Sequence, residues 1–128
     1  VYVIRHGQTD WNLVGKTQGS IEHVEQTGIK QAKIIKNELL NTHLDVILCS
    51  PRNRYKATAE IICADKNIPI IEVSDLRERG FDEFEGKQKN IDYNWVEFWD
   101  WELNKQYEQA ENVRSFLERV SNVMEEIY

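Results

Sequence analysis

Two short segments carry basic side chains together with groups that could act on phosphate. Residues 5–7 read Arg-His-Gly and follow the apolar run 1–4, and residues 50–52 read Ser-Pro-Arg and follow the apolar run 44–49. Ser-Pro is a favourable helix start, and a helix N-terminus offers free N–H groups and a partial positive charge. Arginines, a neutral imidazole and such a helix end suit the binding of a phosphate group. On spacing alone, a purely structural interpretation is equally open. In it, Arg5 and His6 are ordinary loop residues and Arg52 is a solvated helix residue.

The elements around both segments must position them, and the hydrophobic pattern predicts an α/β fold with a mainly parallel sheet. Buried strands are expected at residues 1–4, 44–49 and 69–73, and helices at 28–41, 51–64, 95–103 and 111–128. A loop rich in charge and glycine, residues 74–90, follows the last strand. Ligands of open parallel sheets bind beyond the carboxyl ends of the strands, and both basic segments lie at such ends.

Composition narrows the classes of function. The chain has 128 residues and a net charge of −6, with 41% hydrophobic and 30% charged residues, which is typical of one soluble globular domain. The negative charge argues against binding to nucleic acid or an anionic membrane, and no apolar run approaches the roughly 20 residues of a membrane span. Cys49 and Cys63 lack CxxC spacing and are expected to be free thiols, which favours a cytoplasmic protein.

Four motifs occur in order over residues 1–86. They are Arg-His-Gly-Gln-Thr-Asp-Trp-Asn at 5–12 with Gln-Gly at 18–19, Thr-Gly-Ile-Lys-Gln-Ala at 27–32, Cys-Ser-Pro-Arg-Asn-Arg-Tyr-Lys-Ala-Thr-Ala at 49–59, and Leu-Arg-Glu-Arg-Gly-Phe at 76–81 with Glu-Gly at 85–86. Together these motifs resemble the histidine phosphatase superfamily, the phosphoglycerate-mutase-like proteins, whereas residues 87–128 resemble it only in being helical. The resemblance implies a three-layer α/β sandwich with a mainly parallel central sheet.

The resemblance also implies a phosphatase that hydrolyses small phosphomonoesters through a phosphohistidine intermediate. His6 would be the nucleophile, and Glu78 would protonate the leaving group and then activate water. The implied phosphate-binding residues are Arg5, Gly7, Asn12, Gln18, Gly19 and Arg52. Gly7 is expected to leave room beside the nucleophile and to turn its backbone amide toward the ring or the phosphate. No metal and no cofactor is expected, because the arginines neutralise the charge of the phosphoryl group.

One part of the family pattern, a second His-Gly pair on a later strand, has no counterpart in this sequence. Residues 1–128 are therefore expected to form a single histidine-phosphatase domain that is incomplete at its C-terminus. A phosphoglycerate mutase and a catalytically inactive phosphate-binding or interaction module remain as alternatives. Phosphatase is favoured over mutase because residues 87–112 contain no arginine to bind a second acidic group. The expected partner is a small phosphorylated substrate, and a homodimer is allowed.

Overall fold

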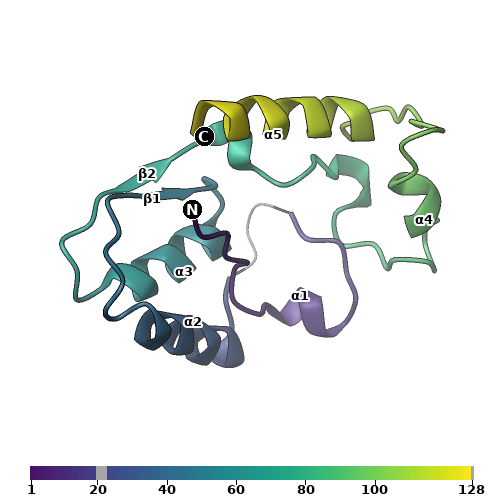
Figure 1. Cartoon of the computed structure of the whole chain (residues 1–128). Helices are drawn as coiled ribbons and strands as arrows, with labels where there is room; N and C mark the ends of the chain where they lie inside the picture. Colours follow the sequence, from purple (N-terminus) through teal and green to yellow (C-terminus); the bar gives the residue numbers. More distant parts are fainter. Residues whose placement is uncertain (20–22, 128) are drawn as a thin grey trace.

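A parallel pair of strands lies between helices in the computed structural model, which describes residues 1–19 and 23–127. Strand β1 (Ile47–Cys49) pairs with β2 (Ile70–Glu72), with Ile47 opposite Ile70. Helices α2 (Gln26–Glu38) and α3 (Asn53–Cys63) lie on one side of the strands and α5 (Val113–Ile127) on the other (Figure 1). Helices on both sides of a parallel sheet confirm the expected α/β class.

Local sequence signals explain where the two central helices begin. Helix α2 starts after Glu25, whose carboxylate accepts hydrogen bonds from the amides of Thr27 and Gly28 at 2.9 and 3.2 Å. Helix α3 starts shortly after Pro51, close to the predicted position. The two helices pack against each other through small buried residues such as Ala32 and Ala59, and α3 also contacts β1. Both helices are confirmed, with bounds shifted by a few residues.

The N-terminal segment is not the buried strand that its apolar residues predict. Val1 and Val3 are 76% and 84% exposed, and no regular secondary structure is assigned to residues 1–8. A strand is stable only when its backbone N–H and C=O groups pair with a neighbour. Within the described ranges, residues 1–6 make no backbone hydrogen bond to another segment. The segment is therefore exposed, and the predicted buried strand at 1–4 is wrong.

The helix expected at 95–103 is also shorter than predicted. Helix α4 (Trp95–Phe98) begins after the N-cap Asn94 and ends after one turn. The carbonyl oxygen of Phe98 accepts a hydrogen bond from the guanidinium of Arg79, so this oxygen is already occupied by a side chain instead of the next helical amide. The chain then turns away through Asn104, which has a positive φ of 42°. A tertiary contact, which hydrophobic periodicity does not encode, ends this helix.

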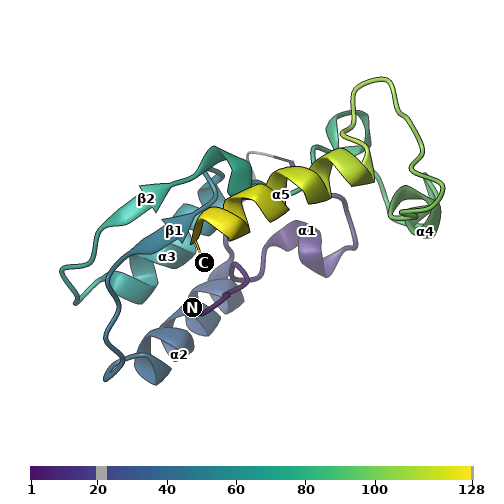
Figure 2. The ribbon, with the colours of Figure 1, turned by 45° about the horizontal axis from the view of Figure 1, so that its top comes forward.

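An aromatic cluster forms a hydrophobic core around α4, which lies at the end of the molecule opposite the strands (Figure 2). Its members are Phe81, Phe84, Tyr93, Trp95, Phe98, Trp99 and Tyr107. Arg79 is fully buried among them, with its guanidinium carbon 3.5 Å from the centre of the Phe98 ring. Burial lowers the pKa of Arg79 to about 10. The segments that flank Glu78 are therefore attached to a rigid core, although they contain only the short 3₁₀ turns η1 (Ser74–Leu76) and η2 (Asp82–Phe84).

The helical segments among residues 1–19 and 23–127 are all short. The longest of them, α5, has 15 residues and buries Val113 and Val123. No helix in these ranges combines the length and the apolar character needed to cross a membrane.

Candidate active site

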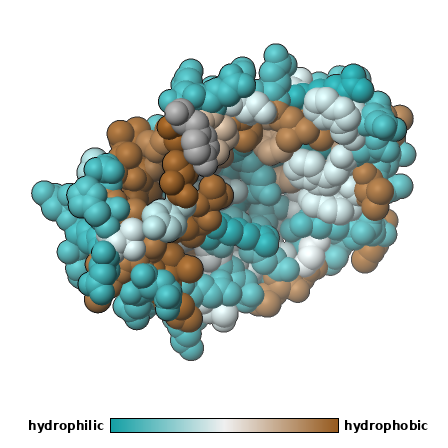
Figure 3. All heavy atoms as spheres, in the orientation of Figure 1, coloured by the Kyte–Doolittle hydropathy of each residue, from teal (hydrophilic) through white to brown (hydrophobic). Residues whose placement is uncertain are grey.

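A cavity of about 270 Å³ gathers most of the side chains that the motifs single out. Figure 3 shows a hydrophilic hollow near the middle of the face that is seen in Figure 1. Five of the predicted residues line the cavity: Arg5, His6, Asn12, Gln18 and Glu78. Three predicted residues, Gly7, Gly19 and Arg52, are not part of the lining. The cavity therefore joins the first and last motifs of the sequence, which are about 70 residues apart.

The His6 ring is oriented by a hydrogen bond to the backbone. Its Nδ1 lies 2.6 Å from the carbonyl oxygen of Gly7, and a carbonyl oxygen can only accept. Nδ1 therefore carries the proton of the neutral ring, which leaves Nε2 with a free lone pair. The ring also lies edge-on to Tyr55, with 5.0 Å between the ring centres. This is the tautomer that a nucleophilic histidine with its Nε2 as the reacting atom needs.

Burial keeps the His6 ring neutral near physiological pH. Desolvation is the largest effect and lowers the pKa of His6 below its ordinary value of 6.5, and the charges of Arg54 and Arg5 lower it further. The hydrogen bond to Gly7 and the charge of Glu78 raise the pKa of His6 but do not reverse the shift. The neutral form, which is the nucleophilic one, therefore predominates at pH 7.

A histidine NMR titration tests this shift directly. We expect the His6 ring of the ¹⁵N-labelled chain to titrate with a midpoint below pH 6.5, because burial disfavours the charged imidazolium. The signals are assigned by their disappearance in His6→Ala. A midpoint at or above 6.5 contradicts the buried, arginine-flanked environment of the ring.

Gly7 has a different role from the one expected. Its amide donates to Oγ1 of Thr58 at 3.0 Å, so this amide faces α3 and not the ring or a phosphate group. A Cβ atom at residue 7 would lie 2.5 Å from the carbonyl oxygen of Gly28, which no side chain tolerates. The expectation that the Gly7 amide faces the reacting group is wrong. Gly7 instead permits the close approach of the nucleophile loop to the start of α2.

Glu78 is held by two donors from helix α3. Its Oε2 accepts from Nη2 of Arg54 at 2.9 Å and from the hydroxyl of Tyr55 at 3.0 Å. The same guanidinium donates through Nη1 to the carbonyl oxygen of Gly19 at 2.6 Å. Burial and the nearby charge of Glu78 raise the pKa of Tyr55 to about 12, so its hydroxyl remains a donor. Both contacts use Oε2, and Glu78 is one of the residues that line the cavity.

The structure brings Arg54, and not Arg52, to the other site residues. Arg52 occupies the N-cap position of α3, and neither Arg52 nor Arg54 is among the residues that line the cavity, but Arg54 donates to Glu78, which does line it. Arg54 is fully buried, and its charge acts on His6. The sequence analysis chose the arginine nearest the strand end. The better signal was the spacing of Arg54 and Thr58, which lie one helical turn apart and therefore share a face of α3.

Gly19 serves the arginine instead of facing the cavity. Its carbonyl oxygen receives the Arg54 guanidinium, and a Cβ atom at residue 19 would lie 2.0 Å from Oε2 of Glu85. The loop at 15–19 is joined to the segment beyond Glu78 by backbone hydrogen bonds of Thr17, whose amide donates to the carbonyl oxygen of Lys87 at 3.0 Å and whose carbonyl oxygen accepts from the amide of Gly86 at 2.9 Å. Gly19 therefore contributes to the site through its carbonyl oxygen, which binds Arg54.

Asn12 and Gln18 line the cavity, and Thr9 binds the amide oxygen of each side chain. The fully buried Thr9 donates its backbone N–H to Oδ1 of Asn12 at 3.0 Å and its hydroxyl to Oε1 of Gln18 at 2.6 Å. The NH₂ group of each side chain is left as a donor. Donors without a charge add hydrogen bonds to an anion in the cavity that also contains Arg5.

Further cavity residues were missed by the sequence analysis. Tyr55 follows Arg54, and Lys89 lies beyond the Glu-Gly motif, with its Nζ 4.3 Å from the centre of the Trp95 ring. Burial lowers the pKa of Lys89. No local pattern marks either residue, since each reaches the cavity through tertiary packing. Across the described ranges, no group of three or more His, Cys, Asp or Glu side chains is placed to hold a metal ion.

Known proteins resemble this chain over two thirds to nearly all of its length. An uncharacterized phosphatase PhoE of Bacillus subtilis is 40% identical over 87 residues, which cover 67% of this chain and 45% of that protein. Phosphoserine phosphatase 1 of Hydrogenobacter thermophilus is 32% identical over 135 aligned residues, with 98% of this chain and 62% of that protein covered. The solved structure of Bacillus stearothermophilus YhfR superposes with a TM-score of 0.86 at 26% identity, over 96% of this chain and 64% of that one.

This chain thus spans about half to two thirds of the length of these relatives. The sequence profile of the histidine phosphatase superfamily (branch 1) matches residues 1–128, so the resemblance extends beyond the helical character expected for residues 87–128. The chain belongs to the histidine phosphatase superfamily, branch 1.

Proposed function

We propose that this chain carries the nucleophile and the general acid of a phosphatase that hydrolyses small phosphomonoesters through a phosphohistidine intermediate. The observation that carries the proposal is the His6 ring, whose Nδ1 is bound to the backbone and whose Nε2 shares a cavity with Glu78. The names of the relatives, which are phosphatases, support hydrolysis over mutase activity.

In the first step, Nε2 of His6 forms a bond to phosphorus while the bond between phosphorus and the leaving oxygen breaks. The bonding electron pair goes to the leaving oxygen, which receives a proton from the carboxyl group of Glu78. In the second step, Glu78 takes a proton from water, and the water oxygen attacks phosphorus. The P–N bond then breaks, and inorganic phosphate leaves with His6 restored.

The phosphoryl oxygens are bound by charged and neutral donors together. Arg5 lines the cavity, and the buried Arg54, which donates to Glu78, adds a positive charge that acts on His6. The amide nitrogens of Asn12 and Gln18 supply neutral donors whose direction Thr9 sets. These donors are in place before the reaction, so they stabilise the negative charge that develops on the equatorial oxygens in the transition state.

A cytoplasmic location accompanies this proposal. Cys49 and Cys63 are both buried free thiols. Such thiols persist where the surroundings are reducing.

The substrate is a small phosphorylated compound, since the cavity of about 270 Å³ accommodates a phosphate group and a few attached atoms.

Glu78→Gln tests the proposed acid role. We expect hydrolysis of an alkyl phosphate to fall by about a hundredfold, because a poor leaving group needs protonation in the transition state. Hydrolysis of p-nitrophenyl phosphate should fall much less, because nitrophenolate leaves without a proton. The measurement is kcat for both substrates at one pH.

The matched control is Glu72→Gln, which neutralises an exposed carboxylate on β2 that pairs with Lys56. It should change neither rate by more than about twofold, since it is a surface ion pair. Equal losses on both substrates in Glu78→Gln would reduce Glu78 to a binding role.

A further inference from the structure

Glu78 lies on irregular backbone, so its position depends on tethers from other elements. The 3₁₀ turn η1 ends at Leu76, two residues before Glu78, and neither a helix nor a strand is assigned to residues 77–81. A proton donor that is misplaced by about 1 Å can lose a hundredfold in rate. The contacts that hold residues 75–80 therefore affect the rate of the proposed reaction, because they set the position of Glu78.

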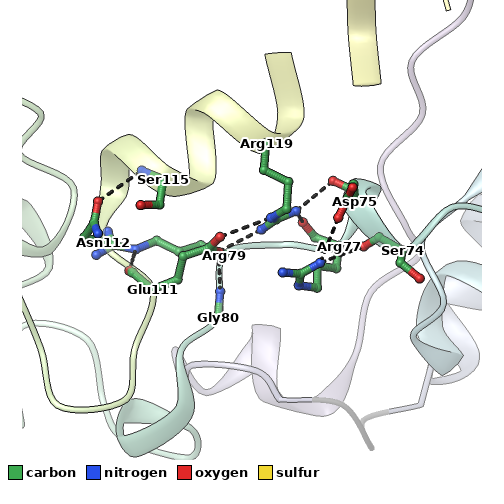
Figure 4. Close-up of polar contacts among 9 residues, drawn as sticks. All are labelled: Ser74, Asp75, Arg77, Arg79, Gly80, Glu111, Asn112, Ser115 and Arg119. Carbon is green, nitrogen blue, oxygen red and sulfur yellow. Dashed lines mark hydrogen bonds and ion pairs between the residues drawn. The ribbon is translucent and has the colours of Figure 1, made fainter. Parts of the chain in front are cut away.

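Arg119 of helix α5 holds the backbone on the N-terminal side of Glu78 (Figure 4). Its Nη1 donates to the carbonyl oxygens of Asp75 and Arg77 at 2.7 and 3.0 Å. Arg77 is the residue directly before Glu78. One nitrogen thus fixes two carbonyl groups within three residues of the proposed acid.

Glu111, just before α5, holds the backbone on the C-terminal side. Its Oε2 accepts from the amide of Gly80 at 3.1 Å, and its own amide donates to the carbonyl oxygen of Gly80 at 2.9 Å. The carbonyl oxygen of Glu111 also accepts from Nε of Arg79 at 2.6 Å. Arg79 and Gly80, the two residues after Glu78, are thus both bound to a single residue.

The two holding residues are joined to each other as a fork. Nε of Arg119 lies 3.1 Å from Oε1 of Glu111, and Nη2 lies 2.7 Å from Oε2. The Arg119 and Glu111 side chains are only 12% and 18% exposed, so water screens the pair weakly. Burial alone raises the pKa of Glu111, but hydrogen bonds from Arg119 and Gly80, together with the charge of Arg119, lower it overall. A bidentate pair of this kind fixes the distance and the direction between its partners.

We infer that the Arg119–Glu111 pair is a positioning device that sets Glu78 at the cavity by binding the backbone on both of its sides. The inference rests on the proposed function, in which Glu78 is the general acid. Neither Arg119 nor Glu111 is among the cavity-lining residues, so both act through Glu78 and do not touch the substrate. The device also couples the acid to α5, whose Phe116 and Val120 line the same cavity.

Three variants of the chain test the inference: Arg119→Lys, which keeps the charge without the fork, Arg119→Ala, and the control Arg114→Ala. Arg114 lies on the same helix and likewise donates to two backbone carbonyl oxygens, those of Trp101 and Glu102, at 3.1 and 3.2 Å. Hydrogen–deuterium exchange of the peptide 74–81 is measured by mass spectrometry, together with kcat for an alkyl phosphate and for p-nitrophenyl phosphate.

Both Arg119 variants should exchange faster over 74–81, and their loss on the alkyl phosphate should exceed the loss on p-nitrophenyl phosphate by about tenfold or more. Arg114→Ala should leave the exchange of 74–81 and both rates unchanged. Unchanged exchange in the Arg119 variants, or equal losses on the two substrates, overturns the inference.

If Arg119→Ala does not fold, Arg119→Lys decides the outcome by the same criteria. If the wild-type chain hydrolyses neither substrate, the proposed function fails, and the exchange data alone then decide whether the pair holds the segment.

Discussion

Replacing His6 with alanine is expected to lower hydrolysis of p-nitrophenyl phosphate by at least about a thousandfold. The reason is that Nε2 of His6 is the proposed bond-forming atom, and alanine leaves no nucleophile in the cavity. Wild-type enzyme quenched during turnover of a ³²P-labelled substrate should carry label that acid removes and base does not. This lability distinguishes a phosphoramidate from a phosphoserine. The variant should carry no label.

His43→Ala is the matched control, because it removes a histidine that is 88% exposed and paired only loosely with Asp45 at 3.7 Å. Its turnover and labelling should equal those of the wild type. Circular dichroism and thermal unfolding of His6→Ala show whether the fold is kept. A folded His6→Ala variant that retains most of its turnover would rule out the covalent mechanism.

The second large effect is expected at Arg54. Arg54→Ala should lower kcat/KM by about a hundredfold or more, because it removes the charge that acts on His6 and one of the two donors to Oε2 of Glu78. Arg52→Ala should change kcat/KM by less than about threefold, since Arg52 lies at the N-cap of α3 whereas the two donors from α3 to Glu78 are Arg54 and Tyr55. Inhibition by inorganic phosphate or vanadate should weaken in Arg54→Ala and stay unchanged in Arg52→Ala.

Arg54 is buried, so its removal also weakens the contact between α3 and the carbonyl oxygen of Gly19. Arg54→Lys keeps the charge and shows how much of the loss comes from the lost fork of hydrogen bonds. Both variants are compared at temperatures below their unfolding transitions. A larger loss in Arg52→Ala than in Arg54→Ala would restore the assignment made from sequence alone.

Elements with local signals were predicted well. The start of α3 follows from Ser50-Pro51, and the buried faces of α2 and α5 follow from apolar residues at helical spacing. These signals act between residues within one or two helical turns. The extent of α4 was predicted poorly, because a buried arginine from a distant segment binds its last carbonyl oxygen.

The strand expected at 1–4 failed for a related reason. Apolar, β-branched residues favour extended backbone, but a strand exists only if a second strand pairs with it, and within the described ranges no segment does. A helix forms its backbone hydrogen bonds within itself. A strand must form them with a second strand, and the hydrophobic pattern of a segment does not indicate which strand that is.

The motifs by themselves determined the family, and they singled out His6 as the candidate nucleophile and Glu78 as the candidate acid. They could do so because residue type and order along the chain are properties of the sequence. Only the tertiary structure decided which arginine of α3 joins the site, where the Gly7 amide points, and that Arg119 and Glu111 hold the segment around Glu78. These contacts join residues 24 to 51 positions apart in the sequence. Direction and distance between such residues depend on how the helices pack, and no local pattern records that packing.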